Sequence, residues 1–172
     1  LFLYLGDLVI VNVHLEGLSN EKIRTHQIEE LSNFIENNEN VILLGDFSAM
    51  NNELPRQTEM LEKFEFSDVW DEINDIDEYS YTFDQEEIID MLNAKQRKKK
   101  NKTQARFDRI LIKSENYKWR PESISIIGKD PLPKYNDERV FISTHFGLFA
   151  KFIDKKPCIL APIHESNSDE ES

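Results

Sequence analysis

Two aspartates and two histidines stand where strands are expected to end or begin, and side chains of these types could activate water. Asp46 follows the apolar run Val41–Leu44, directly after Gly45. Such a run is typical of a strand buried on both faces, and in layered α/β proteins the chemistry lies just beyond the carboxyl ends of these strands. An Asp in this place can equally be a turn former or a helix cap. Asp46 is therefore a candidate catalytic residue that needs support from the rest of the chain.

Asp108 and His145 could provide that support. Asp108 lies in a predicted strand, Arg106–Ile112, and alternation places it on the apolar face that is expected to be buried. A carboxylate there is costly unless a donor meets it, so Asp108 should have a fixed partner. His145 stands directly before another predicted strand, Phe146–Phe152, and could be that donor. An Asp–His pair beside a second carboxylate could activate water and stabilise charge on a phosphoryl group.

His14 ends the second of two predicted strands, Leu1–Leu5 and Leu8–His14. Alternation places His14 on the same face as Asn12, opposite a row of valines. The histidine could line a site with Asp46, or it could simply end a strand at the surface.

The elements that must hold these residues alternate between strands and helices. Ser19 can cap a helix that runs to about Asn37, and its apolar spacing predicts a helix covering a sheet. Arg24 in this helix could lean on the sheet edge or be solvated. The other predicted elements are a helix from about Pro55 to Phe64, a packed segment Phe66–Trp70 with Trp70 in the core, and short strands at Tyr79–Phe83 and Ser123–Ile127.

Length and composition predict one globular domain. The chain has 172 residues, of which 39% are hydrophobic and 31% charged, enough for a real core. Its one cysteine, Cys158, excludes an intrachain disulfide and is compatible with a reducing compartment. Without an apolar run long enough to cross a bilayer, we expect an intracellular monomer, nuclear or cytoplasmic, with no membrane partner. The chain opens inside a predicted strand and without Met, so we expect the natural product to extend upstream.

The charge is strongly negative overall, with basic residues concentrated in one place. The formal net charge is -12, which repels a nucleic-acid backbone unless the positive charges cluster. A predicted mobile surface loop, Ile88–Thr103, could be solvated, a nuclear-import signal or a contact to a phosphate backbone. Its basic part, at about 94–104, contains Lys95, Arg97, Lys98, Lys99, Lys100 and Lys102. The acidic residues 154–172 form a tail that we expect to be disordered.

An ordered set of short motifs runs along the chain to about Phe152. The motifs are His14-Leu15-Glu16, Arg24 with Gln27, Gly45-Asp46-Phe47-Ser48, Asp68-Val69-Trp70, Tyr81-Thr82-Phe83-Asp84, Arg106-Phe107-Asp108-Arg109-Ile110 and Ser143-Thr144-His145-Phe146-Gly147-Leu148. The set resembles the endonuclease/exonuclease/phosphatase superfamily, and within it most resembles the 5′-tyrosyl-DNA phosphodiesterase branch.

The resemblance implies an α/β fold, namely part of a four-layered α/β sandwich with two mixed β-sheets flanked by helices. It spans residues 1–153, and the N-terminal portion of the sandwich has no counterpart in the chain. The implied activity is hydrolysis of a phosphodiester that depends on Mg²⁺ or Mn²⁺. The substrate of the branch is DNA joined to a tyrosine through its 5′ phosphate.

The resemblance also implies roles for individual residues. Asp46 would orient or deprotonate the attacking water, His145 would stabilise negative charge on the phosphate, and Asp108 would hold His145. His14 would line the phosphate pocket, and Phe83 stands where the branch has an aromatic contact to the DNA end. The implied substrate-binding residues are His14, Ser48, Phe83 and Arg106. The metal ligands within this chain stay unknown.

Three departures from the family pattern favour a second interpretation. Ser48 stands where the family has an asparagine, Thr144 stands where it has an aspartate, and the upstream half with its metal-binding glutamate has no counterpart. A hydroxyl is a poor replacement for a charged oxygen ligand of Mg²⁺. The alternative is therefore a catalytically degenerate or truncated member that binds nucleic acid or a protein. A third alternative keeps the fold but changes the substrate to another phosphodiester.

Overall fold

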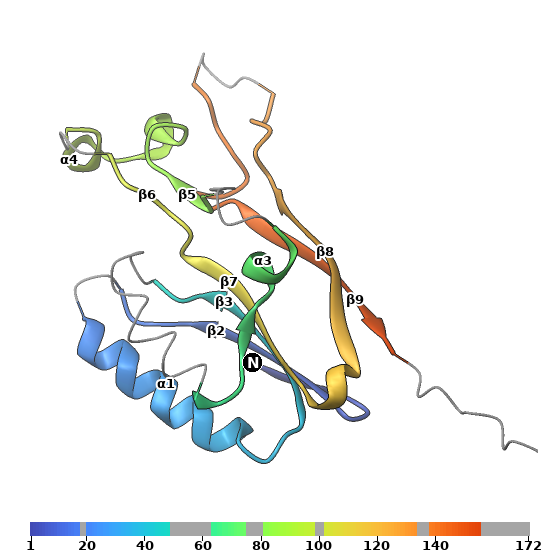
Figure 1. The fold of residues 1–172 in the computed structure, drawn as a ribbon. Coiled ribbons are helices and arrows are strands. Elements are labelled where there is room, and N and C mark those ends of the chain that lie inside the picture. The colour runs from blue at the N-terminus through green and yellow to red at the C-terminus, as the bar shows by residue number, and fades with distance from the viewer. Residues whose placement is uncertain (18–19, 49–62, 75–80, 99–101, 134–137, 156–172) are drawn as a thin grey trace, which may run out of the picture.

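The computed structural model describes residues 1–17, 20–48, 63–74, 81–98, 102–133 and 138–155 (Figure 1). Most of the predicted helix at about Pro55 to Phe64 lies outside these residues. So do Lys99, Lys100 and nearly all of the acidic tail. Among the described residues, no helix is long and apolar enough to cross a membrane.

A five-stranded mixed sheet forms the centre of the molecule (Figure 1). Strands β2 and β3 are parallel, whereas the other pairs are antiparallel. The register places His14 beside Asp46, and Asp46 beside Asp108, because β7 runs opposite to β3 and begins where β3 ends. In spatial order, the strands are β1 (Phe2–Leu5), β2 (Leu8–His14), β3 (Asn40–Asp46), β7 (Asp108–Ser114) and β4 (Ser67–Asp68).

Helix α1 (Glu21–Ile35) covers one face of this sheet (Figure 1). Its buried positions include Ile28 and Ile35, at the helical spacing that the sequence predicts. Phe34 lies off this buried face, because it is 72% exposed and contacts the ring of Phe2. The core on this face comprises Val9, Val11, Leu15, Ile28, Ile35, Val41, Leu43, Phe47, Phe66 and Leu111.

The opposite face packs against a second sheet and a short helix. The second sheet pairs β8 (Trp119–Ile127) with β9 (Gly147–Asp154) antiparallel, and α3 (Val69–Ile73) lies beside it. This core comprises Leu8, Ile42, Val69, Trp70, Ile110, Ile112 and Ile124. The α/β architecture is confirmed, with a helix, a mixed sheet and a second sheet stacked as layers. Within the described residues, the second sheet is an antiparallel pair rather than a mixed sheet.

The segment predicted to be a mobile surface loop, Ile88–Thr103, contains short helices in its described part, and its mobility stays a prediction. It lies between β5 (Phe83–Asp84) and β6 (Gln104–Ala105), and contains the 3-10 helix η1 (Ile89–Met91) and helix α4 (Ala94–Arg97). We call residues 83–105 the β5–β6 segment. Its apolar anchors Ile88 and Leu92 are buried against Phe141 and Phe146. Two anchors are too few to produce a visible period, which explains why the sequence pattern fades here.

Several predicted boundaries also shift. The strand predicted at Arg106–Ile112 begins at Asp108 as β7, and β8 begins four residues before Ser123, at Trp119. Of the strand predicted at Tyr79–Phe83, the described residues retain only β5. The last strand continues to Asp154, one residue beyond the predicted domain.

Candidate active site

One end of the central sheet brings His14, Asp46 and Asp108 together, each on an adjacent strand. The approach is close because Gly45 has no side chain. Its φ is +132°, and a Cβ added there would lie 2.0 Å from the carbonyl oxygen of Val13. A glycine is therefore required for β2 and β3 to carry their polar residues side by side.

Ser48 orients Asp46. Its backbone N–H and its hydroxyl Oγ both donate to Asp46 Oδ1, at 2.7 Å and 3.0 Å. The other carboxylate oxygen, Oδ2, lies 3.7 Å from His14 Nε2 and 3.9 Å from His145 Nδ1. One oxygen of Asp46 is thus held by the turn that follows β3, while the other faces the two histidines.

The partner that Asp108 needs is His145. Asp108 Oδ2 lies 2.9 Å from His145 Nδ1, and both side chains are mostly shielded from solvent. The hydrogen bond to Asp108 raises the pKa of His145, and the negative charges of Asp108 and Asp46 act in the same direction, against the opposing effect of partial burial. The site therefore favours a protonated imidazole.

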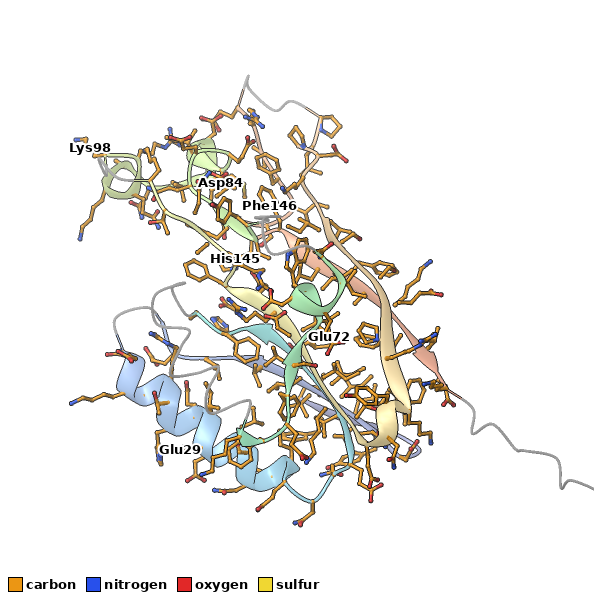
Figure 2. The ribbon with its side chains drawn as sticks, in the orientation of Figure 1. Glu29, Glu72, Asp84, Lys98, His145 and Phe146 are labelled. Atoms are coloured by element: carbon orange, nitrogen blue, oxygen red, sulfur yellow. The ribbon has the colours of Figure 1, made fainter. Side chains whose placement is uncertain are left out.

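Aromatic rings surround His145. The ring centroids of Phe83 and Phe107 lie 5.4 Å and 5.8 Å from that of His145, and 5.4 Å from each other. Figure 2 shows His145 where the β5–β6 segment approaches β7. These groups open onto a cavity of about 290 Å³. It is lined by Gly17, Asp46, Ser48, Phe83, Gln85, Leu92, Gln96, Thr103, Phe107 and His145.

Apart from Phe83, the cavity residues of the β5–β6 segment were not predicted from the sequence. Leu92 and Gln96 reach the cavity only because the segment folds back. Gln85 is 3% exposed, and its side chain joins the backbone of Gln96 to that of Thr103. Phe107 was also missed, although its position beside Asp108 was a usable signal.

Helix α1 fixes the loop that follows His14. Arg24 is fully buried and donates through Nη1 to the carbonyl oxygens of Glu16 and Gly17, at 3.2 Å and 2.5 Å. Gln27 Oε1 accepts a hydrogen bond from the backbone N–H of Glu16 at 2.9 Å. Arg24 is therefore neither solvated nor merely leaning on the sheet, since it holds one rim of the cavity.

Arg106 lies in a neighbouring ion-pair cluster. Its guanidinium donates to both oxygens of Asp68 and to Asp71, and Arg109 also donates to Asp68. Arg106 also stacks over Trp70, with its Cζ 5.8 Å from the ring centroid. The structure brings His14, Ser48 and Phe83 to the candidate site, whereas Arg106 supports the strands beside it. The roles of all four in substrate binding stay predictions.

The donor set suits a divalent cation. Asp46, Asp108 and His145 each offer one ligand atom, and these atoms lie within 4.8 Å of one another. The carboxylate oxygens of Asp46 and Asp108 suit Mg²⁺ or Mn²⁺, whereas a protonated His145 would have no lone pair to offer a metal. The residues present therefore fit the expected cation in part. Thr144, beside His145, is exposed.

No protein-family model matches the sequence, and no curated protein matches it. Solved structures do match. A humanized TDP2 of D. rerio with 14 mutations has a TM-score of 0.63 at 21% identity, covering 85% of this chain and 55% of that one. D. rerio TDP2 complexed with single-strand DNA product has a TM-score of 0.61 at 22% identity, covering 85% and 56%. An endonuclease/exonuclease/phosphatase family protein of Bacteroides thetaiotaomicron has a TM-score of 0.58 at 14% identity, covering 87% and 51%.

The chain has the endonuclease/exonuclease/phosphatase fold. It spans a little over half of the length of the TDP2 structures that it matches. The candidate site is built on the layers of that fold, with Asp46 and Asp108 on the mixed sheet and His145 directly before β9 of the second sheet.

Proposed function

We propose that this chain carries the hydrolytic residues of a divalent-metal-dependent phosphodiester hydrolase. The observation that carries the proposal is the contact of His145 with Asp108, beside Asp46, at the mouth of the cavity. A protonated histidine next to two carboxylates supplies an electrophile and a base within one small space. Proteins that share this fold include an endonuclease/exonuclease/phosphatase family protein of Bacteroides thetaiotaomicron.

In this proposal, each residue has a distinct task. Asp46, fixed by Ser48, orients a water and takes up its proton through the oxygen that faces the cavity. His145 donates from its ring to the phosphate oxygen on which negative charge develops, and Asp108 holds that ring in place. His14, which is largely exposed, contacts a second phosphate oxygen.

Asp46 and Asp108 are the residues that would hold Mg²⁺ or Mn²⁺. A bound divalent cation would add Lewis-acid stabilisation of the phosphate charge.

The preferred substrate is a DNA end joined to tyrosine through its 5′ phosphate. Phe83, Phe107 and Leu92 give the cavity an apolar wall, which suits a planar group attached to the phosphate. The TDP2 of D. rerio, one of the matching structures, holds single-strand DNA product. Substrate and cation are both part of the proposal.

The β5–β6 segment offers a surface for the rest of a nucleic acid. Arg97 donates to the carbonyl oxygens of Leu92 and Asp90, and Lys102 donates to that of Arg97, so these two cations help to fold the segment. Lys95 and Lys98 are exposed, and Lys98 lies on the outer end of the segment in Figure 2. We expect Lys95 and Lys98 to contact phosphates of the strand.

Replacing both lysines tests this contact. Lys95→Gln with Lys98→Gln should weaken oligonucleotide binding and reduce the slope of log K against log salt by about 1.4, because two single-strand phosphate contacts are lost. The matched control is Lys22→Gln with Lys151→Gln, which removes two exposed lysines from α1 and β9. Equal slopes for the two double variants would contradict the contact.

A second candidate function is a non-catalytic module that binds nucleic acid or a protein. Two observations favour it: Ser48 directs its hydroxyl to Asp46 rather than to the cavity, and Thr144 provides no carboxylate beside His145. Such a module would bind oligonucleotides without cleaving them.

The test of the proposed function is a panel of substrates, each incubated with the chain in Mg²⁺, Mn²⁺ or EDTA. The panel comprises a 5′-phosphotyrosyl oligonucleotide, the same oligonucleotide with a 5′ phosphate alone, and an abasic duplex. Metal-dependent release of tyrosine from the first substrate alone would support the preferred substrate. Binding without cleavage of any substrate, by a folded chain, would favour the module.

A further inference from the structure

Thr82 connects the two segments that carry Asp108 and His145. Its side chain is fully buried, and it lies directly before β5. Thr82 Oγ1 accepts hydrogen bonds from the backbone N–H groups of Phe107 and Asp108, both at 3.0 Å. On its other side, the carbonyl oxygen of Thr82 accepts one from the N–H of Phe146, at 2.7 Å.

These hydrogen bonds of Thr82 restrict the distance between Asp108 and His145. Asp108 is the first residue of β7, and β7 is held on its other flank by β3. His145 is attached to Phe146, whose side chain is locked in the buried cluster with Ile88 and Leu92. Thr82 therefore joins β7 to the loop before β9, at the point where Asp108 Oδ2 meets His145 Nδ1.

The hydroxyl is specifically suited to this place. A hydroxyl oxygen has two lone pairs, and Thr82 uses Oγ1 to accept from two N–H groups at once. A methyl group in place of the hydroxyl would leave the N–H groups of Phe107 and Asp108 without this acceptor. Leaving buried donors unpaired is costly. The cost would be relieved by a shift of the Phe107–Asp108 backbone, which would move the carboxylate away from the imidazole.

We propose that Thr82 is a positioning residue, whose hydroxyl and carbonyl oxygens together hold the Asp108 carboxylate against the His145 ring. The inference rests on the proposed function for its catalytic meaning. The contact itself can be measured without any substrate.

The test compares Thr82→Val, which keeps the shape and removes the acceptor, with Thr82→Ser, which keeps the acceptor. The direct readout is the downfield proton resonance of His145 Nδ1–H by NMR at low pH, assigned by its loss in His145→Gln. We expect the resonance to persist in Thr82→Ser and to disappear, or move strongly upfield, in Thr82→Val. Far-ultraviolet circular dichroism and the thermal midpoint establish that each variant is folded.

If the chain is active, kinetics supply a second readout. Thr82→Val should lower kcat by roughly 10-fold to 100-fold, as for other residues that orient a ligand at a site, with KM little changed. Thr82→Ser should restore most of kcat. A loss of binding alone, seen as a raised KM with kcat unchanged, would contradict the inference.

Two NMR results would overturn the inference, and a third would separate it from the proposed function. An unchanged His145 resonance in folded Thr82→Val would overturn the inference. So would a Thr82→Ser variant that loses the resonance, because packing of the methyl group would then be responsible; this result is decisive even if Thr82→Val does not fold. If the resonance behaves as expected while no substrate is cleaved, the positioning role stands and the proposed function fails.

Discussion

At the scale of single residues, Gly45 sets the geometry on which the candidate site depends. We predict that Gly45→Ala lowers the free energy of unfolding by about 2–4 kcal/mol, since the new Cβ would lie 2.0 Å from the Val13 carbonyl oxygen. Gly6→Ala is the matched control, because Gly6 also has a positive φ but open space around it, and should cost about 1–2 kcal/mol. Urea denaturation measures both. Equal losses of unfolding free energy in the two variants would mean that the close contact of Gly45 with Val13 does not cause the destabilisation.

His145 links the site to pH. Its pKa is raised in the folded chain, so the protonated form contributes stability below the unfolded pKa of about 6.5. This contribution is lost as the pH rises through the higher, folded pKa. We predict that the free energy of unfolding, measured in EDTA, falls over that window, and that the fall is reduced in Asp108→Asn. An identical pH profile in the variant would show that Asp108 is not the source of the shift.

Strand alternation and expected burial together predicted which residue needs a hydrogen-bonding partner. The need of Asp108 for a donor follows from its place on an apolar strand face, and His145 meets it. Arg106 could not be placed in this way, because its partners Asp68 and Asp71 are more than thirty residues away and nothing local announces the pairing. Thr82 could not be singled out either, since a threonine in the predicted strand Tyr79–Phe83 is typical of ordinary β-sheet packing.

At the scale of elements, Asp68 holds β4, α3 and β7 together. Its carboxylate caps α3 through the N–H of Trp70 and pairs with Arg106 and Arg109, all three charged side chains being mostly buried. Burial and the nearby charge of Arg106 lower the pKa of Arg109, whereas Asp68 opposes this shift. This cluster keeps β7, and therefore Asp108, in place between β3 and the edge strand β4.

We predict that Asp68→Ala lowers the free energy of unfolding by about 3–5 kcal/mol, the usual cost of leaving a buried partner charge uncompensated. The matched control is Asp71→Ala, which removes a carboxylate that also pairs with Arg106 but whose side chain is 65% exposed. That change should cost no more than about 1 kcal/mol. Similar losses in the two variants would contradict the central place of Asp68.

Elements with strong periodicity could be predicted from sequence, and the β5–β6 segment could not. α1 and β3 carry long apolar patterns, and their predicted positions were close. In the β5–β6 segment, order comes from a capping box at Asn93 and Gln96 and from the bridging side chain of Gln85. Such hydrogen bonds form only in one tertiary arrangement and leave no periodic pattern in the sequence. The prediction of a mobile loop therefore rested on the lysine-rich composition.

At the scale of the whole molecule, the site exists only where two sheets meet. His14, Asp46 and Asp108 come from the central sheet, whereas His145 comes from the loop that leads into β9.

Strand β1 forms one edge of the central sheet. All four residues of β1 are exposed, and within the described residues β1 pairs only with β2 and leaves an open edge.

In the proposed function, Asp46 acts in a metal-dependent hydrolysis. The most direct measurement is the rate of cleavage of a 5′-phosphotyrosyl oligonucleotide, with Mg²⁺ and with EDTA, by this chain and by Asp46→Asn side by side. We predict cleavage that requires the metal and falls by about 10²-fold to 10⁴-fold in the variant. Equal rates in the two proteins, or no cleavage by a chain that circular dichroism shows to be folded, would contradict the claim.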